Sequence, residues 1–237
     1  MEIKILHMFG DVMNLYGEYA NMEVMKRYLT DLGYDVCVDT LSLYERKDIS
    51  GYDFYYMGSG TEKNQKRVLP ELKHYEPAVK AACESGKTML FTGNSFELLG
   101  SKITAADGMQ YEGLNLEDFV TIEGKRRIVG DAIAQLGEQR FVGFINKCGK
   151  TSGIKNSLFE MRMGFGNDKE KGTEGLRIRN CFGTHLTGPI MVKNPNFLAM
   201  IAGLVIGEEL PAPTYEAMKR SYETTLKALE ARLSEQK

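Results

Sequence analysis

The chain has 237 residues, 43% of them apolar and 26% charged, with a formal net charge of -2 and an isoelectric point near 6.0. This length suits one sizeable globular domain, and we expect a single domain over residues 1–237. The balanced charge argues against a nucleic-acid partner, and no stretch approaches the roughly 20 apolar residues of a membrane span. We therefore expect a cytoplasmic protein with no signal peptide and no membrane insertion.

The cysteines are scattered and show neither a CxxC pair nor another metal-ligand spacing. In a chain of this length, that pattern predicts reduced and mostly buried thiols. We predict no metal site and no cofactor. The four residues concerned are Cys37, Cys83, Cys148 and Cys181.

In the first part of the chain, strand-like and helix-like segments alternate at short intervals. Residues 2–9 are rich in β-formers, and the apolar residues of 22–32 that follow have helical spacing. Further strands are predicted at 34–38 and 53–57, and an amphipathic helix with a break at Pro77 is predicted at 68–85. This alternation predicts an α/β fold with a mixed, mostly parallel sheet covered on both faces.

From about residue 109 to 180 the pattern changes to shorter β-like runs between glycine-rich turns, such as 119–122 and 140–144. We interpret these runs as antiparallel additions to the sheet. An apolar helix is predicted at 197–206, and a charged amphipathic helix from about 214 to 235.

The stretch 87–100, KTMLFTGNSFELLG, predicts a buried strand, a sharp turn and the start of a helix. In α/β enzymes such a turn often holds a nucleophile, because the strand opens toward a crevice and the helix directs N–H groups at developing negative charge. A second motif, 149–151, has the Gly-Lys-Thr of a phosphate-binding loop, but Phe144 stands where that loop needs a glycine. We therefore do not predict nucleotide binding.

Seven motifs, spread in order over nearly the whole chain, resemble one protein family. They lie at 11–17, 53–60, 92–100, 127–131, 164–167, 172–175 and 183–189. Together they resemble the glutaminase subunits of lipid II isoglutaminyl synthase (GatD-type), within the CobB/CobQ-like class I glutamine amidotransferases. The segment 142–151 also resembles that family, which accounts for its Gly-Lys-Thr better than a phosphate-binding loop does.

The resemblance implies a three-layer, flavodoxin-like class I glutamine amidotransferase domain. It also implies that a cysteine on the nucleophile turn hydrolyses glutamine, with a histidine in a GT-x-x-HGP strand end as its base. The ammonia would pass to a Mur-ligase-like partner, MurT, which amidates D-glutamate in the peptidoglycan precursor. Such chemistry needs a thiolate to form a thioester and an imidazole to move the proton.

This chain departs from the family pattern at both catalytic positions. In the register of the resemblance, Gly93 stands at the nucleophile position and Thr187 at the base position. Asn94 and Ser95 replace two glycines of the turn. Glycine has no side chain to attack with, and a threonine hydroxyl is not a general base near neutral pH. Glutaminase activity by the family mechanism is therefore not expected.

Two residues could substitute for the lost pair. Ser95 lies in a sequence close to the G-x-S-x-G elbow of serine hydrolases, and His185 lies two residues before Thr187 on the same face of a strand. The simpler interpretation is that Ser95 caps a helix starting near Phe96 and that His185 is an ordinary strand residue, because Glu97 replaces the last elbow glycine and no acidic third member is evident.

Other matched positions are candidates for binding a glutamine-like small molecule. Residues 58–60, Gly-Ser-Gly, follow a strand end and could supply oxyanion-hole N–H groups, although glycines there also simply permit a tight turn. Asn94 lies on the turn, and Arg127 matches an arginine that the resemblance associates with glutamine or its passage. The candidates are thus Gly58, Ser59, Gly60, Asn94 and Arg127.

Two hypotheses follow from the sequence. The first is a GatD-like protein without glutamine hydrolysis that serves as a binding or regulatory subunit of a MurT-like ligase. The second is an amidase or hydrolase that uses Ser95 and His185, or one with residual glutaminase activity.

Overall fold

The computed structural model describes residues 2–170 and 172–235. A six-stranded sheet forms the centre of the molecule, in the order β11-β12-β4-β3-β1-β2. Its strands are parallel except β11, which pairs antiparallel with β12 at one edge. The strands are β1 (Glu2–Met8), β2 (Asp35–Leu41), β3 (Phe54–Met57), β4 (Thr88–Thr92), β11 (Leu176–Ile178) and β12 (Cys181–Thr184).

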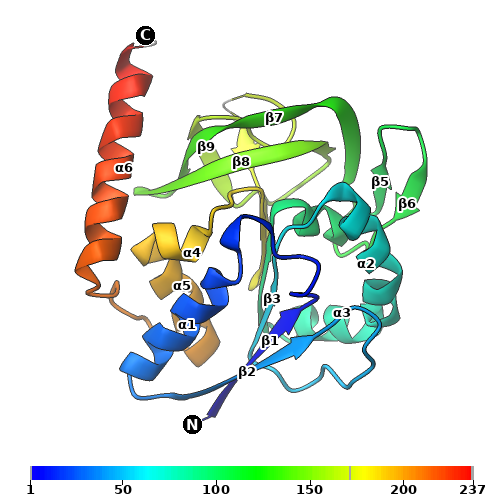
Figure 1. Ribbon diagram of the computed structural model, residues 1–237, viewed down its shortest axis with the longest axis horizontal. Helices are drawn as coiled ribbons and strands as arrows, with labels where there is room; N and C mark the ends of the chain where they lie inside the picture. The colour runs from blue at the N-terminus through cyan, green and yellow to red at the C-terminus, as the bar shows by residue number, and fades with distance from the viewer. Residues whose placement is uncertain (1, 171, 236–237) are drawn as a thin grey trace.

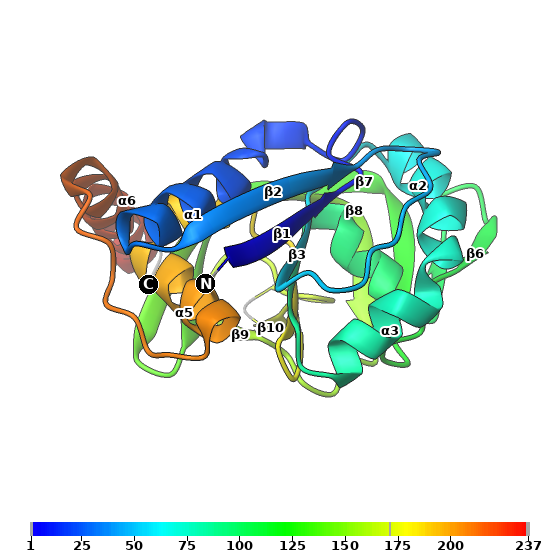
Figure 2. The same ribbon diagram turned by 90° about the horizontal axis from the view of Figure 1, so that it is seen from below.

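Helices cover both faces of this sheet, which gives the three layers that the resemblance implied (Figures 1 and 2). Apolar side chains of α2 (Glu62–His74) and α3 (Glu76–Glu84) pack on one face. Those of α1 (Ala20–Asp31), α4 (Ile190–Lys193) and α5 (Pro195–Ile206) pack on the other. Every residue of β3 and β4 is buried, as expected of strands covered on both faces.

A second sheet lies across the carboxyl ends of the parallel strands (Figure 1). The prediction that the runs between 109 and 180 add to the central sheet is therefore wrong for all of them except β11. The runs 119–122 and 140–144 belong to one long antiparallel hairpin of β7 (Val120–Leu136) and β8 (Gln139–Ser152). The remaining strands of this sheet are β5 (Lys102–Thr104), β6 (Gln110–Glu112), β9 (Phe159–Met163) and β10 (Thr173–Glu174).

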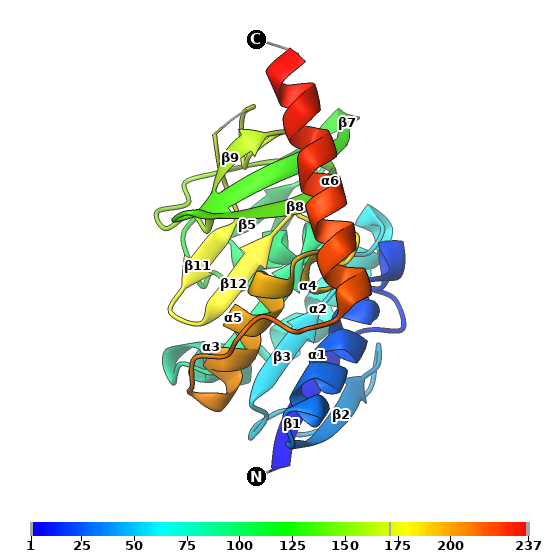
Figure 3. The same cartoon turned by 90° about the vertical axis from the view of Figure 1, so that its left-hand side faces the viewer.

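Two helices differ in detail from their predictions. The segment predicted at 68–85 contains two helices, which are separated at Tyr75, two residues before Pro77. The first of them, α2, also begins six residues earlier than predicted, at Glu62. The C-terminal helix α6 (Glu216–Glu235) forms as predicted and packs Tyr222, Leu226 and Leu229 against the β7–β8 hairpin (Figure 3). Among the described residues, no helix is both long and apolar enough to cross a membrane.

Candidate functional site

The turn after β4 faces the strand end after β12, as the family register requires. β4 and β12 are parallel neighbours, with Thr92 paired to Thr184, so the residues that follow them emerge side by side. Gly93 has φ = +61°, and a Cβ placed on it would lie 3.3 Å from Cγ2 of Thr187. The two positions that the resemblance assigns to the nucleophile and the base therefore lie opposite each other across the sheet edge.

The space between these two positions is filled. A Cβ on Gly93 would overlap the Cβ of Ser59, so the backbone turn lies directly against the Ser59 side chain. The Thr187 hydroxyl donates to the Phe144 carbonyl at 2.9 Å. The cavity that Ser59 lines is only about 10 Å³, close to the room that one water molecule needs. Glutamine does not fit in this cavity.

One of the backbone N–H groups expected in an oxyanion hole, that of Gly60, is already bonded. The side chain of Asn94 accepts from the Gly60 N–H at 2.9 Å and donates to the Gly60 carbonyl at 2.9 Å. A glycine at position 94 could make neither bond. Gly58 packs against the Met13 backbone, where a side chain would clash. The glycines of the 58–60 turn thus allow close packing of the backbone. The Asn94 side chain occupies the Gly60 N–H.

Beneath the turn, a buried carboxylate holds the two family positions in place. Glu18 accepts hydrogen bonds from the hydroxyls of Thr92 and Tyr56 and from the Gly188 N–H at 3.1 Å. Burial raises the pKa of Glu18, although these bonds act in the opposite direction. Because Thr92 precedes Gly93 and Gly188 follows Thr187, Glu18 links the nucleophile turn to the base strand.

Ser95 and His185 are both buried, but they face different partners. The Ser95 hydroxyl lies 2.9 Å from the Met57 carbonyl and 2.8 Å from the Thr92 carbonyl, so its proton is directed at the backbone. The helix predicted to start near Phe96 begins at Gly93 and is a 3₁₀ helix (η2, Gly93–Leu99), so Ser95 lies inside it. Between the described residues no hydrogen bond joins Ser95 to His185.

His185 lies between two carboxylates that the sequence did not reveal. Its Nε2 is 3.2 Å from Oε1 of Glu97, and its Nδ1 is 3.3 Å from Oε1 of Glu174 without hydrogen-bond geometry. In the sequence, Glu97 is notable only because it replaces the last glycine of the elbow motif, and Glu174 is only one residue of a glycine-rich loop. All three side chains are at most 2% exposed. The three side chains are buried, and of them only Glu97 lines the small cavity.

Lys147 is a further buried charge that the sequence did not reveal. It is 3% exposed, and its ammonium donates to the carbonyls of Gly166 at 2.7 Å and Asn167 at 3.0 Å. Burial lowers the pKa of Lys147 to about 8, against the attraction of Glu174 and Glu97. Its position within an alternating strand is a signal for burial, but a lysine there is not a recognisable motif.

Arg127 closes the mouth of the small cavity. Its guanidinium binds Glu62 at 2.5 Å and the Asn146 side-chain oxygen at 2.6 Å, and Asn146 in turn donates to the Tyr16 hydroxyl at 2.9 Å. Cys148 lies beside them, and burial together with nearby carboxylates raises the pKa of its thiol to about 12. Three N–H groups of Arg127 are thus bonded within this chain, to Glu62 and Asn146, and the Cys148 thiol stays protonated at neutral pH.

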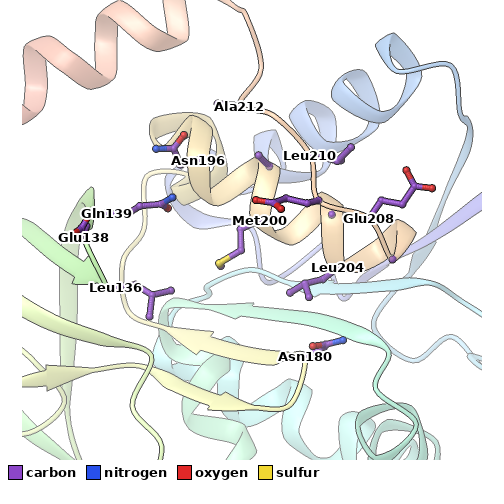
Figure 4. Close-up of a pocket in the computed structure, with 14 residues that line it drawn as sticks. Leu136, Glu138, Gln139, Asn180, Asn196, Met200, Leu204, Glu208, Leu210 and Ala212 are labelled. Atoms are coloured by element: carbon purple, nitrogen blue, oxygen red, sulfur yellow. The ribbon is translucent and has the colours of Figure 1, made fainter.

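A much larger groove lies elsewhere. It measures about 1060 Å³ and is lined by α5 and the turn of the β7–β8 hairpin, including Leu136, Met200 and Leu204 (Figure 4). None of the predicted site residues lines this groove. In the part of the chain that the structure describes, no group of three or more His, Cys, Asp or Glu side chains is arranged to hold a metal ion.

Two solved structures share the fold across almost the whole chain. One is the PurLQS structure from Thermotoga maritima, with a TM-score of 0.55 at 12% identity, covering 95% of this chain and 100% of that one. The other is a glutamine amidotransferase from the same organism, with a TM-score of 0.55 at 12% identity, covering 99% of this chain and 97% of that one. At this identity the likeness establishes the fold, which is of the class I glutamine amidotransferase type.

Sequence comparison identifies closer relatives. The GatD subunit of the glutamine-hydrolysing lipid II isoglutaminyl synthase from Streptococcus pneumoniae is 28% identical over 224 residues, which is 91% of this chain and 86% of the relative. The GatD subunit from Staphylococcus aureus is 30% identical over 194 residues, 81% of this chain and 80% of the relative. Residues 4–195 match the CobB/CobQ-like glutamine amidotransferase domain. The chain therefore belongs to the CobB/CobQ-like glutamine amidotransferase family and is of the GatD type.

Proposed function

We propose that this chain is a GatD-like subunit that has lost glutamine hydrolysis and acts as a binding or regulatory partner of a MurT-like Mur ligase. One observation carries the proposal. In the register of the resemblance, Gly93 and Thr187 stand at the nucleophile and base positions, and the Ser59 side chain fills the space where a side chain at position 93 would begin. A nucleophile and its base act as a unit, so the loss of both removes the family reaction.

Two further features support the proposal. The cavity at the site is about 10 Å³, and the Gly60 N–H is bonded to Asn94. Binding of glutamine and stabilisation of an oxyanion would both require these contacts to be broken. Meanwhile the Glu18 bonds keep the turn and the strand end in their family arrangement. A protein that keeps the family fold around a closed site can still bind a partner through its surface.

The nitrogen source of the partner ligase tests this proposal. The chain is combined with the MurT-like subunit of its own organism, and amidation of the peptidoglycan precursor is followed with either glutamine or ammonium chloride as nitrogen donor. We expect amidation with ammonium and none above background with glutamine. Amidation with glutamine at a rate comparable to that with ammonium would contradict the proposal.

A serine-directed fluorophosphonate probe tests the alternative hydrolase. Because the Ser95 hydroxyl is buried and directed at backbone carbonyls, we expect no labelling of the folded protein. Labelling that disappears in Ser95→Ala but persists in Ser59→Ala would replace the non-catalytic proposal with a serine hydrolase.

A further inference from the structure

The long hairpin of the second sheet carries a bulge beside the closed site. Pairing between β7 and β8 breaks after Glu123 and resumes at Ile128, so residues 124–127 are not paired across the hairpin. A bulge of this kind bends a strand and re-aims its side chains, and bulges are concentrated at functional sites. Lys125 and Arg126 lie at the tip of the bulge, and both are exposed.

The bulge is held at both ends, which makes it a rigid feature. Before it, the buried Glu123 forms an ion pair with Lys66 of α2. After it, Arg127 binds Glu62, also of α2, and Asn146 of β8. Only the middle of the bulge is left free, so its side chains are presented in a fixed place and a partner loses little freedom by binding them.

A groove of about 620 Å³ runs along this bulge and has an apolar floor. Ile122 and Ile128 line it, and Ile122 is 56% exposed. Large apolar side chains gathered at one exposed place are a mark of an interaction surface.

The rim of the groove is basic although the whole chain has a net charge of -2. Four cations line it, Lys125, Arg126, Arg127 and Lys150, against the single carboxylate of Asp168. Across residues 2–170 and 172–235, neither Lys125 nor Arg126 takes part in an ion pair. A local cationic rim on an acidic protein selects an acidic partner.

We propose that this groove, named here the bulge groove, docks a segment of the partner subunit in which an aliphatic or aromatic side chain is flanked by Asp or Glu. The proposal rests on the proposed function, because it gives the ligase subunit its docking surface. A concave apolar floor accepts an inserted side chain, whereas a membrane surface needs a protruding one. Sequence-independent nucleic-acid binding would combine cations with aromatic stacking platforms, and the groove lining contains no aromatic side chain among the described residues.

Binding of the purified ligase subunit to variants of the full chain tests this inference. Lys125→Glu/Arg126→Glu reverses the charge of the rim, and Ile122→Ala removes the apolar contact. The matched controls are Lys219→Glu/Arg220→Glu, an adjacent exposed basic pair on α6, and Leu32→Ala, an exposed leucine at the end of α1. Titration calorimetry gives the Kd, and circular dichroism confirms that each variant is folded.

We expect the charge reversal to raise the Kd at least about tenfold and to flatten its dependence on salt. Ile122→Ala should raise the Kd several-fold, and both controls should stay within about twofold of wild type. Wild-type binding with an unchanged Kd in Lys125→Glu/Arg126→Glu and Ile122→Ala would overturn the docking inference and leave the proposed function standing. Failure of the wild type to bind the ligase subunit would overturn both. Binding of wild type to anionic vesicles or single-stranded DNA, lost in the charge-reversed variant, would reassign the groove to that ligand.

Discussion

At the scale of single residues, the backbone around Gly93 leaves little room for any side chain at that position. Its φ of +61° is the left-handed region that favours glycine, and the Ser59 side chain occupies the place of a Cβ. Nucleophile elbows tolerate a strained backbone, but a cysteine at position 93 would overlap the Ser59 side chain in the present backbone. The closed site is therefore built into the packing around Gly93 and does not depend only on the missing thiol.

Gly93→Ala should destabilise the protein by about 2–4 kcal/mol, because the left-handed backbone costs about 1–2 kcal/mol and overpacking against Ser59 costs a similar amount or more. Gly86→Ala is the matched control. Gly86 has φ = +79° but open space around a Cβ, so only the backbone cost of about 1–2 kcal/mol applies. Urea unfolding measures both. Equal losses in the two variants would show that Ser59 does not crowd position 93.

Lys147 makes a prediction about pH. Its folded pKa is about 8 and its ordinary value is 10.5, so between these values the unfolded chain binds a proton that the folded chain has lost. Stability should then rise with pH relative to Lys147→Met, by about 3 kcal/mol at most across this window. Urea unfolding at several pH values from 7.5 to 10.5 measures the difference, with the exposed Lys63→Met as control. A difference between wild type and Lys147→Met that is constant over this range would contradict a buried, proton-losing lysine.

The residues of the site were predictable only where a motif fixed their register. The Gly183-Thr184 and Gly188-Pro189 pairs set the register that puts Thr187 at the base position of the resemblance. The bonds of Asn94 to Gly60 span 34 residues, and the approach of Glu174 to His185 needs a strand of the second sheet to meet the first. No local spacing encodes such contacts, and the two acids around His185 were missed for this reason.

At the scale of elements, α6 depends on the β7–β8 hairpin for its position. Leu229 is the buried residue of α6 and packs in a cluster with Ile133, Val142 and Met163. Polar contacts reinforce it at the periphery, as between Tyr222 and the Arg140 carbonyl at 2.7 Å. The helix is otherwise largely exposed, so this one contact should decide whether it stays docked.

Leu229→Ala should cost about 2–4 kcal/mol, because it leaves a cavity beneath α6. Hydrogen exchange should then accelerate in residues 216–235 more than in β3 and β4, since α6 can detach without disrupting the central sheet. Lys227→Ala, at an exposed position of the same helix, is the control and should leave exchange unchanged. Uniform acceleration over the whole chain would show that α6 and the central sheet unfold as one unit.

Secondary structure with strong periodicity was predictable from sequence, and its assembly was less so. Alternating strands and helices before residue 100 predict the parallel sheet correctly, because each apolar run has one type and clear punctuation. The β7–β8 hairpin was divided into short runs because its bulge and glycines interrupt the alternation. Which sheet those runs join depends on long-range pairing, which alternation does not report.

At the scale of the whole molecule, the two sheets have different roles in the structure. The central sheet and its helices keep the frame of a glutamine amidotransferase, while the second sheet seals the end where its site would open (Figure 1). The bridge between Phe144 of β8 and Thr187 joins the two sheets at the base position itself. We propose that the bulge groove, which is accessible beside the closed site, is the surface that a partner binds.

The most direct test of this account is the release of glutamate from glutamine by the wild-type chain, alone and saturated with its MurT-like partner. A closed cavity of about 10 Å³, without a thiol at position 93, predicts no glutamate above the enzyme-free blank in either sample. Sustained turnover that scales with protein concentration and survives replacement of Cys148 and Cys181 by serine would contradict the account, because the site would then have to open and use a nucleophile other than a thiol at those positions.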